Sequence, residues 1–158
     1  MKQAGPAVLE LKVPPPVVAI LIALAMWLLS FKLSPLHLAP AVRVGLAMVL
    51  SLVSGGFSIG GILECRRART TVNPHKPARA TSLVTTGVYR ITRNPMYLGL
   101  AFLLVAWAVA LSAPLLLVGP LAFVLYIGRF QIQPEERILT KLFGADYTRY
   151  ASRVRRWL

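Results

Sequence analysis

Two groups of polar side chains have the types and spacing needed to bind a charged small molecule. One is the pair Glu135 and Glu136, which are adjacent carboxylates in a chain with five acidic residues against eighteen Lys and Arg. The other is the stretch TTGVYRITRNPMY, residues 85–97, which stands directly before an uninterrupted apolar run. Because opposite charges attract most strongly away from bulk water, the paired carboxylates are candidates for holding a cationic ligand group.

Both groups also have a purely structural explanation. Asn94 followed by Pro95 is typical of a helix start, where the Asn side chain caps a free backbone N–H and proline suits the first helical position. Tyr89 and Tyr97 would then be interfacial aromatic residues. The two carboxylates follow Pro134, and the first turn of a helix favours negative charge. Local sequence alone does not decide between structure and binding.

Other chemistry has little support in the sequence. The single cysteine, Cys65, excludes an intrachain disulfide framework and a cysteine-based zinc cluster. His37 and His75 fall on opposite sides of the membrane in the topology derived below, so we predict no metal site. Asp146 beside Gly144 is typical of a turn or a helix cap.

The composition is that of a membrane protein. Hydrophobic residues make up 56% of the 158 residues and charged residues 15%, against about 25% charged in soluble domains. The net charge is +13, and fourteen of the eighteen basic residues lie in two patches, 66–93 and 129–156. Neither patch belongs to a polar module long enough to bind nucleic acid, so we predict no nucleic-acid partner.

Four apolar segments approach the roughly 20 residues that cross a bilayer, at 13–33, 43–63, 95–112 and 114–131. The last two come from a run of 35 uncharged residues, which as one helix would be about 50 Å long. Because the hydrocarbon core is only about 30 Å thick, we expect a hairpin broken at Pro114. The segment 134–157 repeats apolar residues at three- and four-residue intervals, which predicts an amphipathic interfacial helix, broken at Gly144. The predicted fold is a single all-α, polytopic membrane domain with four transmembrane helices.

The basic patches set the predicted topology. Loop 64–94 and the tail after the fourth segment carry the basic residues, so both are expected to be cytoplasmic, with the N- and C-termini on that side. The basic face of the last helix would meet anionic lipid headgroups. Small residues in 43–63 predict close helix packing within the chain, against the first helix, and we expect a monomer in a prokaryotic inner membrane.

Two ordered blocks resemble a known family. The sequence SLVTTGVYRITRNPMYLG, residues 82–99, is followed after the hairpin by PEERILTKLFGADYTRYASRVRRW, residues 134–157. Together they resemble the isoprenylcysteine carboxyl methyltransferase family and its relatives among phospholipid methyltransferases. That pattern is LVT-x-G-x-Y, then R-H-P-x-Y-x-G, a transmembrane hairpin, an E-E pair and F-G-x-x-Y-x-x-Y. The match covers about half of the chain.

The resemblance implies an integral membrane enzyme that methylates a lipophilic substrate with S-adenosylmethionine. Two positions depart from the family: Asn94 replaces a histidine, and Gln131 stands where the prenylcysteine branch has an arginine that contacts the substrate carboxylate. The second departure weakens the prediction of a prenylcysteine substrate but leaves the cofactor site intact. Carried over position by position, the cofactor-binding residues are Thr81, Ser82, Leu83, Val84, Tyr89, Asn94, Pro95, Met96, Tyr97 and Glu135.

The methyl acceptor stays open at this point, between a prenylcysteine-like carboxylate and a lipid headgroup. A carboxylate is ionised at pH 7 and needs no general base, given a reference pKa near about 4. An amine would need its proton removed, and Glu136 is then the candidate base, with Arg129 the other catalytic candidate. Two alternatives are a nicotinamide-dependent membrane reductase, since sterol reductases carry a similar C-terminal hairpin, and a non-enzymatic scaffold that binds anionic lipid.

Overall fold

A computed structural model describes residues 10–70 and 80–158. His75, Lys76 and Arg79, which entered the predictions above, lie outside these ranges. Helices make up all the regular structure of the described residues, which confirms the all-α class. The elements are α1 Pro15–Ser30, α2 Pro40–Arg67, the 3-10 helix η2 Gly87–Arg90, α3 Pro95–Ala110, the 3-10 helix η3 Pro114–Leu117, α4 Val118–Ile127, the π-helix η4 Gly128–Ile132 and α5 Gln133–Arg153.

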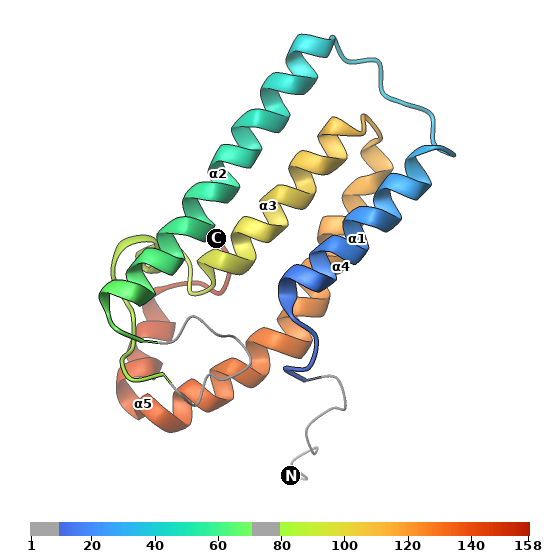
Figure 1. Cartoon of the computed structure of the whole chain (residues 1–158). Helices are drawn as coiled ribbons and strands as arrows, with labels where there is room; N and C mark the ends of the chain where they lie inside the picture. The colour runs from blue at the N-terminus through green and yellow to red at the C-terminus, as the bar shows by residue number, and fades with distance from the viewer. Residues whose placement is uncertain (1–9, 71–79) are drawn as a thin grey trace.

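The long helices form a bundle in which α3 is central (Figure 1). On one side α3 packs with α1 and α4, and on the other side it packs with α2. The hydrophobic core lies among α1, α3 and α4, where Met26, Leu104, Phe123 and Ile127 are buried. The hairpin between α3 and α4 turns at Ser112, whose φ of 54° lies in the left-handed region.

Small residues allow α2 and α3 to approach closely. A Cβ at Gly99 would lie 2.1 Å from Ser58 Oγ and 2.8 Å from the Ser54 carbonyl oxygen, so no larger residue fits there unless the helices separate. The small residues of α2 therefore pack within the chain. Their partner, however, is chiefly α3 and not the first helix as the sequence suggested.

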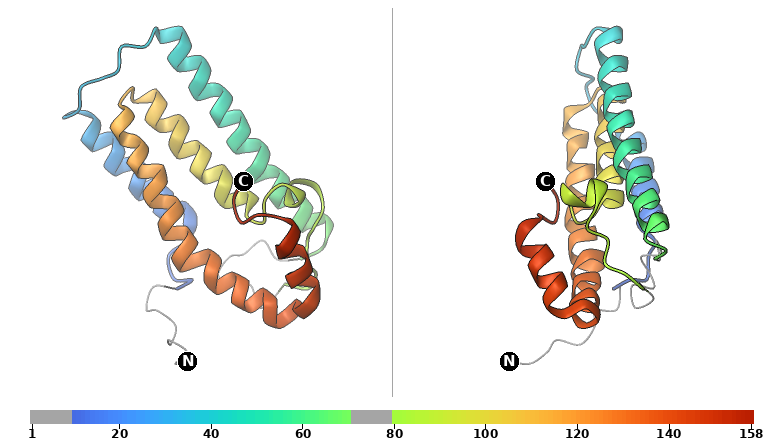
Figure 2. Two further views of the ribbon diagram at one scale, coloured as in Figure 1. Left: turned by 180° about the vertical axis from the view of Figure 1, so that it is seen from behind. Right: turned by 90° about the vertical axis from the view of Figure 1, so that its left-hand side faces the viewer.

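The chain stays helical from α4 through η4 into α5 (Figure 2). Ile132, the residue before α5, has helical φ and ψ of −66° and −47°. Glu135 and Glu136 therefore do not lie at a free helix N-terminus, and the explanation from the helix dipole is wrong for them. Further along, Gly144 has φ 52° and ψ −121°, which bends α5 at the predicted break.

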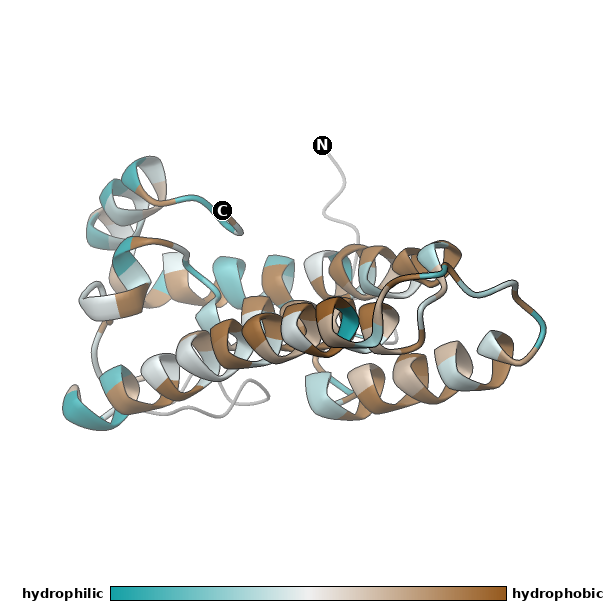
Figure 3. Cartoon of the chain, turned by 90° about the horizontal axis from the view of Figure 1, so that it is seen from above, coloured by the Kyte–Doolittle hydropathy of each residue, from teal (hydrophilic) through white to brown (hydrophobic). Residues whose placement is uncertain are grey.

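The helices are long and apolar where the sequence is uncharged. Two of them, Pro40–Arg67 and the continuous helix Pro114–Arg153, have the length and composition needed to cross a membrane, and α1 and α3 are shorter apolar helices. Large apolar side chains face outward, including Ile20 at 65%, Leu52 at 73% and Leu125 at 65% exposure. Hydrophilic residues concentrate on α5, at one end of the bundle (Figure 3). The apolar part of the last long helix ends at Ile132, so the polar helix α5 lies beyond it.

Candidate cofactor-binding site

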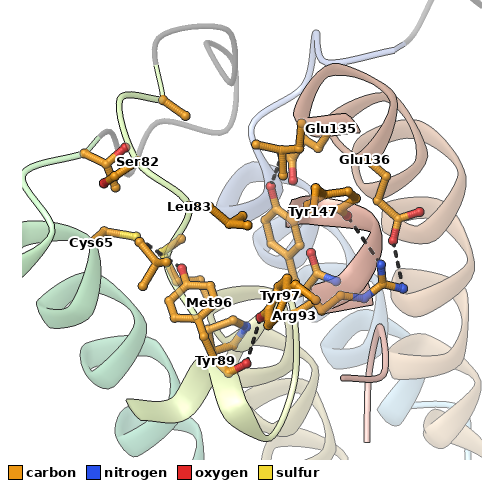
Figure 4. A pocket seen from close by; sticks show the side chains of 17 residues that line it. Cys65, Ser82, Leu83, Tyr89, Arg93, Met96, Tyr97, Glu135, Glu136 and Tyr147 are labelled. Carbon is orange, nitrogen blue, oxygen red and sulfur yellow. Dashed lines mark hydrogen bonds and ion pairs between the residues drawn. The ribbon is translucent and has the colours of Figure 1, made fainter. Parts of the chain in front are cut away.

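A cavity lies where the end of α2, the loop before α3, the start of α3 and α5 come together (Figure 4). It is thus built at the polar end of the apolar bundle. Nine of the ten predicted cofactor residues and one of the two catalytic candidates line it, although their roles stay predictions. Its lining residues are Cys65, Thr70, Ala80, Ser82, Leu83, Val84, Tyr89, Arg93, Asn94, Pro95, Met96, Tyr97, Glu135, Glu136, Leu139, Tyr147 and Tyr150.

The loop wall of the cavity is fixed to the end of α2 by Glu64. Thr86 Oγ1 donates a hydrogen bond to one carboxylate oxygen of Glu64, and Arg67 pairs with the other at 2.9 Å. Gly87, with φ 56°, lies over the same carboxylate, where an added Cβ would approach Glu64 Cδ to 2.7 Å. Glycine is therefore required at position 87, because a side chain there would prevent η2 from packing on α2. The sequence offered no sign of this contact.

Thr81 is the predicted cofactor residue that does not line the cavity. Its N–H donates to Thr70 Oγ1 at 3.1 Å, and its hydroxyl donates to the Arg69 carbonyl oxygen at 3.0 Å. The neighbouring Ser82 hydroxyl donates to the Ala68 carbonyl oxygen at 2.9 Å. Thr81 thus closes the loop onto the end of α2, and only its neighbours face the cavity.

Asn94 precedes α3 as expected, but its side chain makes no capping hydrogen bond. Its Nδ2 instead donates to the Arg156 carbonyl oxygen at 2.8 Å. Thr92 Oγ1 donates to the same oxygen at 3.1 Å, and the Arg93 N–H donates to the Arg155 carbonyl oxygen at 3.0 Å. The capping prediction was wrong because the segment after α5 passes close to the start of α3 and competes for the amide.

Tyr97 and Glu135 meet across the cavity. The Tyr97 hydroxyl donates to Glu135 Oε1 at 2.5 Å, which links the first turn of α3 to α5. Burial raises the pKa of Glu135 to about 8, the Tyr97 hydrogen bond opposes that rise, and the charge of Glu136 adds to it. The carboxyl therefore titrates near neutral pH, well above the range of a carboxyl group in water.

Glu136 is held by two arginines. Arg156 forms a bidentate contact with it, at 3.0 Å from Nε to Oε1 and 2.6 Å from Nη2 to Oε2, and Arg93 Nη2 lies 3.2 Å from Oε1. The hydrogen bonds to Glu136 raise the pKa of Arg156. Both oxygens of Glu136 are therefore already engaged by cations.

Arg93 brings positive charge to the cavity that Glu136 does not fully balance. Its Nη1 lies 3.4 Å from the Tyr147 hydroxyl, and its buried Nε has no hydrogen-bond partner. An anionic group bound in the cavity would pair with the guanidinium, because Arg93 is one of the lining residues. The cavity therefore has a carboxylate at Glu135 for a cation and a guanidinium at Arg93 for an anion.

Tyrosines form much of the remaining wall. Tyr89 is buried, with its hydroxyl 3.2 Å from Cys65 Sγ, and its carbonyl oxygen accepts a 2.7 Å hydrogen bond from the Tyr150 hydroxyl. Burial raises the pKa of Tyr89, so this phenol stays neutral. Tyr147 and Tyr150 contact edge to face at 6.4 Å between ring centroids. The family pattern contains both tyrosines. The sequence analysis used them only as part of the apolar repeat that predicts an amphipathic helix.

Arg129 and Gln131 lie away from the cavity lining. Arg129 pairs with Glu10 at 2.9 Å and lies over the Phe130 ring at 5.5 Å. Gln131 is fully buried and donates from Nε2 to the Val13 carbonyl oxygen at 2.7 Å. Both side chains tie η4 to the segment before α1. The catalytic role predicted for Arg129 gains no support from this position.

Comparison with known proteins places the chain in a family whose catalytic members transfer methyl groups. Residues 42–146 match the phospholipid methyltransferase family, and this chain belongs to that family. The matched range contains all the residues that line the cavity except Tyr147 and Tyr150. The family predicted from the two sequence blocks is therefore confirmed.

Three relatives illustrate the likeness. The chain is 31% identical over 131 residues to protein-S-isoprenylcysteine O-methyltransferase B of Arabidopsis thaliana, over 81% of this chain and 57% of that protein. It is 33% identical over 113 residues to methanethiol S-methyltransferase of Pseudomonas deceptionensis, over 70% of this chain and 39% of that protein. An uncharacterized protein of Haemophilus influenzae is 46% identical over 63 residues, which cover 40% of this chain and all of that protein. The matched region thus spans 57% of the first methyltransferase and 39% of the second.

Proposed function

We propose that this protein is an S-adenosylmethionine-dependent methyltransferase that acts on a lipophilic acceptor at the cytoplasmic face of a membrane. The observation that carries the proposal is the Tyr97 and Glu135 pair, because it sets an ionisable carboxylate in a cavity where apolar helices end. Membership of the phospholipid methyltransferase family supports it independently.

The cavity residues suit this cofactor. S-adenosylmethionine supplies a methyl group on a positively charged sulfur, together with a carboxylate and a nucleoside. Glu135 would hold the cationic sulfur, and Arg93 would donate hydrogen bonds to the carboxylate. The rings of Tyr89 and Tyr147 would offer flat apolar walls. The protein's contribution is chiefly to orient the reactants and exclude water, and positioning of this kind is worth up to about 7 to 11 kcal/mol.

The membrane placement follows from the distribution of charge. We infer four spans, with α5 at the interface and the cavity on the cytoplasmic side, where the basic residues gather. A lipophilic acceptor would then reach the cavity from the bilayer while the soluble cofactor enters from the cytosol. The inferred membrane is the inner membrane of a prokaryote, and the inferred state is a monomer.

The acceptor is best sought among groups that need no protein base. Both oxygens of Glu136 are engaged by arginines, so an amine would have to displace an arginine to reach this carboxylate. A carboxylate is ionised at pH 7, and one relative is named for O-methylation of isoprenylcysteine, whereas the thiol in the name of the other must lose a proton, as an amine must. We therefore propose a lipophilic carboxylate, with a thiol or a lipid headgroup as the next candidates.

Calorimetry of the purified protein with S-adenosylhomocysteine tests the cofactor. Binding by the wild type is expected, and a parallel titration with S-adenosylmethionine should show weaker binding by Glu135→Gln, with the exposed Asp146→Asn as a matched control. A folded sample that binds NADPH but not S-adenosylhomocysteine would instead support the reductase. A protein that binds neither of these ligands, and that loses binding to anionic lipid when its tail arginines are removed, would support the scaffold. Mass spectrometry of membranes with and without the protein would identify the methylated product.

A further inference from the structure

The end of the bundle opposite the cavity carries an arginine without an acidic partner. Arg43, in the first turn of α2, donates from Nη1 to Ser112 Oγ at 3.1 Å. Of the five acidic residues in the sequence, Glu64 is at the other end of the same helix, about 32 Å away at 1.5 Å per residue. The other four precede α1 or lie on α5, at the cavity end (Figure 1).

Fold stability does not explain a cation at this position. The first turn of a helix is an unfavourable place for positive charge, and Arg43 is partly buried. The contact with Ser112 fixes the guanidinium instead of releasing it to solvent. Ser112 is itself buried, and its carbonyl oxygen accepts a 2.6 Å hydrogen bond from the Leu36 N–H. Arg43 is thus held where the connection between α1 and α2 meets the turn between α3 and α4.

An apolar groove begins at this arginine. It runs along α2 past Val44, Met48 and Leu52, with Ala110 of α3 on its other side. These three side chains are 52%, 59% and 73% exposed. Because they are four residues apart they share one helix face, and that face extends about 12 Å along the axis. The groove thus combines a positively charged end, at Arg43, with a narrow apolar surface along α2.

We propose that this groove binds one anionic phospholipid, with its phosphate on Arg43 and an acyl chain along Val44, Met48 and Leu52. Charge complementarity selects an anionic lipid, because the guanidinium binds phosphate oxygens through paired N–H donors and none of the five acidic residues is at this end to hold the choline cation of a zwitterionic lipid. The apolar surface selects a lipid over a free anion. The proposal rests on the inferred membrane placement, but it does not depend on methyl transfer.

Native mass spectrometry of the delipidated protein in detergent tests the site. The protein is titrated with phosphatidylglycerol and with phosphatidylcholine of the same acyl chains. The expected result is one phosphatidylglycerol bound at least tenfold more tightly than phosphatidylcholine, and a preference under threefold in Arg43→Gln. The exposed Arg149→Gln should keep the full preference. Equal binding of both lipids by the wild type, or an unchanged preference in Arg43→Gln, would overturn the proposal.

Further arms separate the possible occupants. Ser51→Phe fills the groove and keeps the Arg43 contact with Ser112, so it should also lose the preference, and it decides the question if Arg43→Gln does not fold. Glycerol phosphate that binds as tightly as the lipid would indicate a small-anion site. A dimer mass that disappears in Ser51→Phe, without lipid selectivity, would indicate a second copy of the chain. Either result would overturn the lipid proposal, while S-adenosylhomocysteine binding in the same variants reports separately on the cofactor cavity.

Discussion

The Tyr97 hydroxyl lies 2.5 Å from Glu135 Oε1, so a hydrogen bond across the cavity joins two residues that are 38 positions apart. Tyr97 is in the first turn of α3, and Glu135 is in α5 just beyond the apolar part of the last long helix. The geometry of the whole hairpin therefore determines this contact. Any change that rotates α5 relative to α3 should therefore alter the affinity of a ligand that binds to the Glu135 carboxylate.

Glu135→Gln should weaken S-adenosylmethionine binding much more than S-adenosylhomocysteine binding, because only the former carries a charged sulfur. The loss of a charge-assisted contact is worth roughly 1.5 to 3 kcal/mol, which corresponds to about a 10- to 100-fold loss of affinity. We expect a change under about threefold for the uncharged product. Calorimetry with both ligands measures this difference, and equal losses would place Glu135 against another part of the cofactor.

S-adenosylmethionine affinity should rise with pH between 6 and 8. Burial raises the pKa of Glu135 to about 8, so below that pH the free carboxyl must lose a proton before it can hold a cation. As pH rises through the pKa this cost disappears, and the affinity gains up to about tenfold per pH unit. The slope should be smaller for S-adenosylhomocysteine and absent in Glu135→Gln. A slope that persists in the variant would assign the titration to another group.

Gly99→Ala should destabilise the protein, because the new Cβ would meet Ser58 Oγ at 2.1 Å and the Ser54 carbonyl oxygen at 2.8 Å. Overpacking of this kind costs about 1 to 3 kcal/mol. Gly55→Ala is the matched control, since a Cβ there meets nothing within 4 Å. We expect a lower unfolding midpoint in detergent for Gly99→Ala only. Equal midpoints would mean that α2 and α3 separate easily.

Arg156→Gln should lower both stability and cofactor affinity. It removes the bidentate contact with Glu136 and leaves Arg93 alone on that carboxylate. Because the Arg156 side chain is 37% exposed, we expect only about 1 kcal/mol in chemical unfolding. Arg153→Gln, which is exposed, is the control. Unchanged cofactor binding in a destabilised Arg156→Gln would limit this arginine to a structural role.

The helices could be predicted because their physical causes are local. Uncharged runs of bilayer length, Pro114 inside the longest run and Gly144 within the last helix each leave a mark in the sequence. The pairing of helices was harder to predict. Small residues in the second segment signalled a close contact but not its partner, and α3 provides it through Gly99, which the sequence alone does not distinguish from other glycines.

The candidate site was predictable only in part. The resemblance to the family supplied most of the residues along one wall, including Tyr89 and Tyr97. Arg93 counted only as one basic residue of the patch 66–93, since nothing local links it to Glu136 more than 40 positions later. Asn94 was expected to cap its own helix, because the competing Arg156 carbonyl comes from the far end of the sequence. Contacts between distant segments depend on the folded path of the chain, which local patterns do not encode.

The carbonyl oxygens of Arg155 and Arg156 accept hydrogen bonds from residues 92–94 and so hold the lining residues Arg93 and Asn94 in place. During synthesis, residues 92–94 leave the ribosome more than sixty positions before these partners do. The nascent chain can therefore insert its helices into the membrane long before it has a finished cavity. A newly made molecule should acquire its ligand only after translation has passed Arg156, which separates membrane insertion in time from the onset of activity.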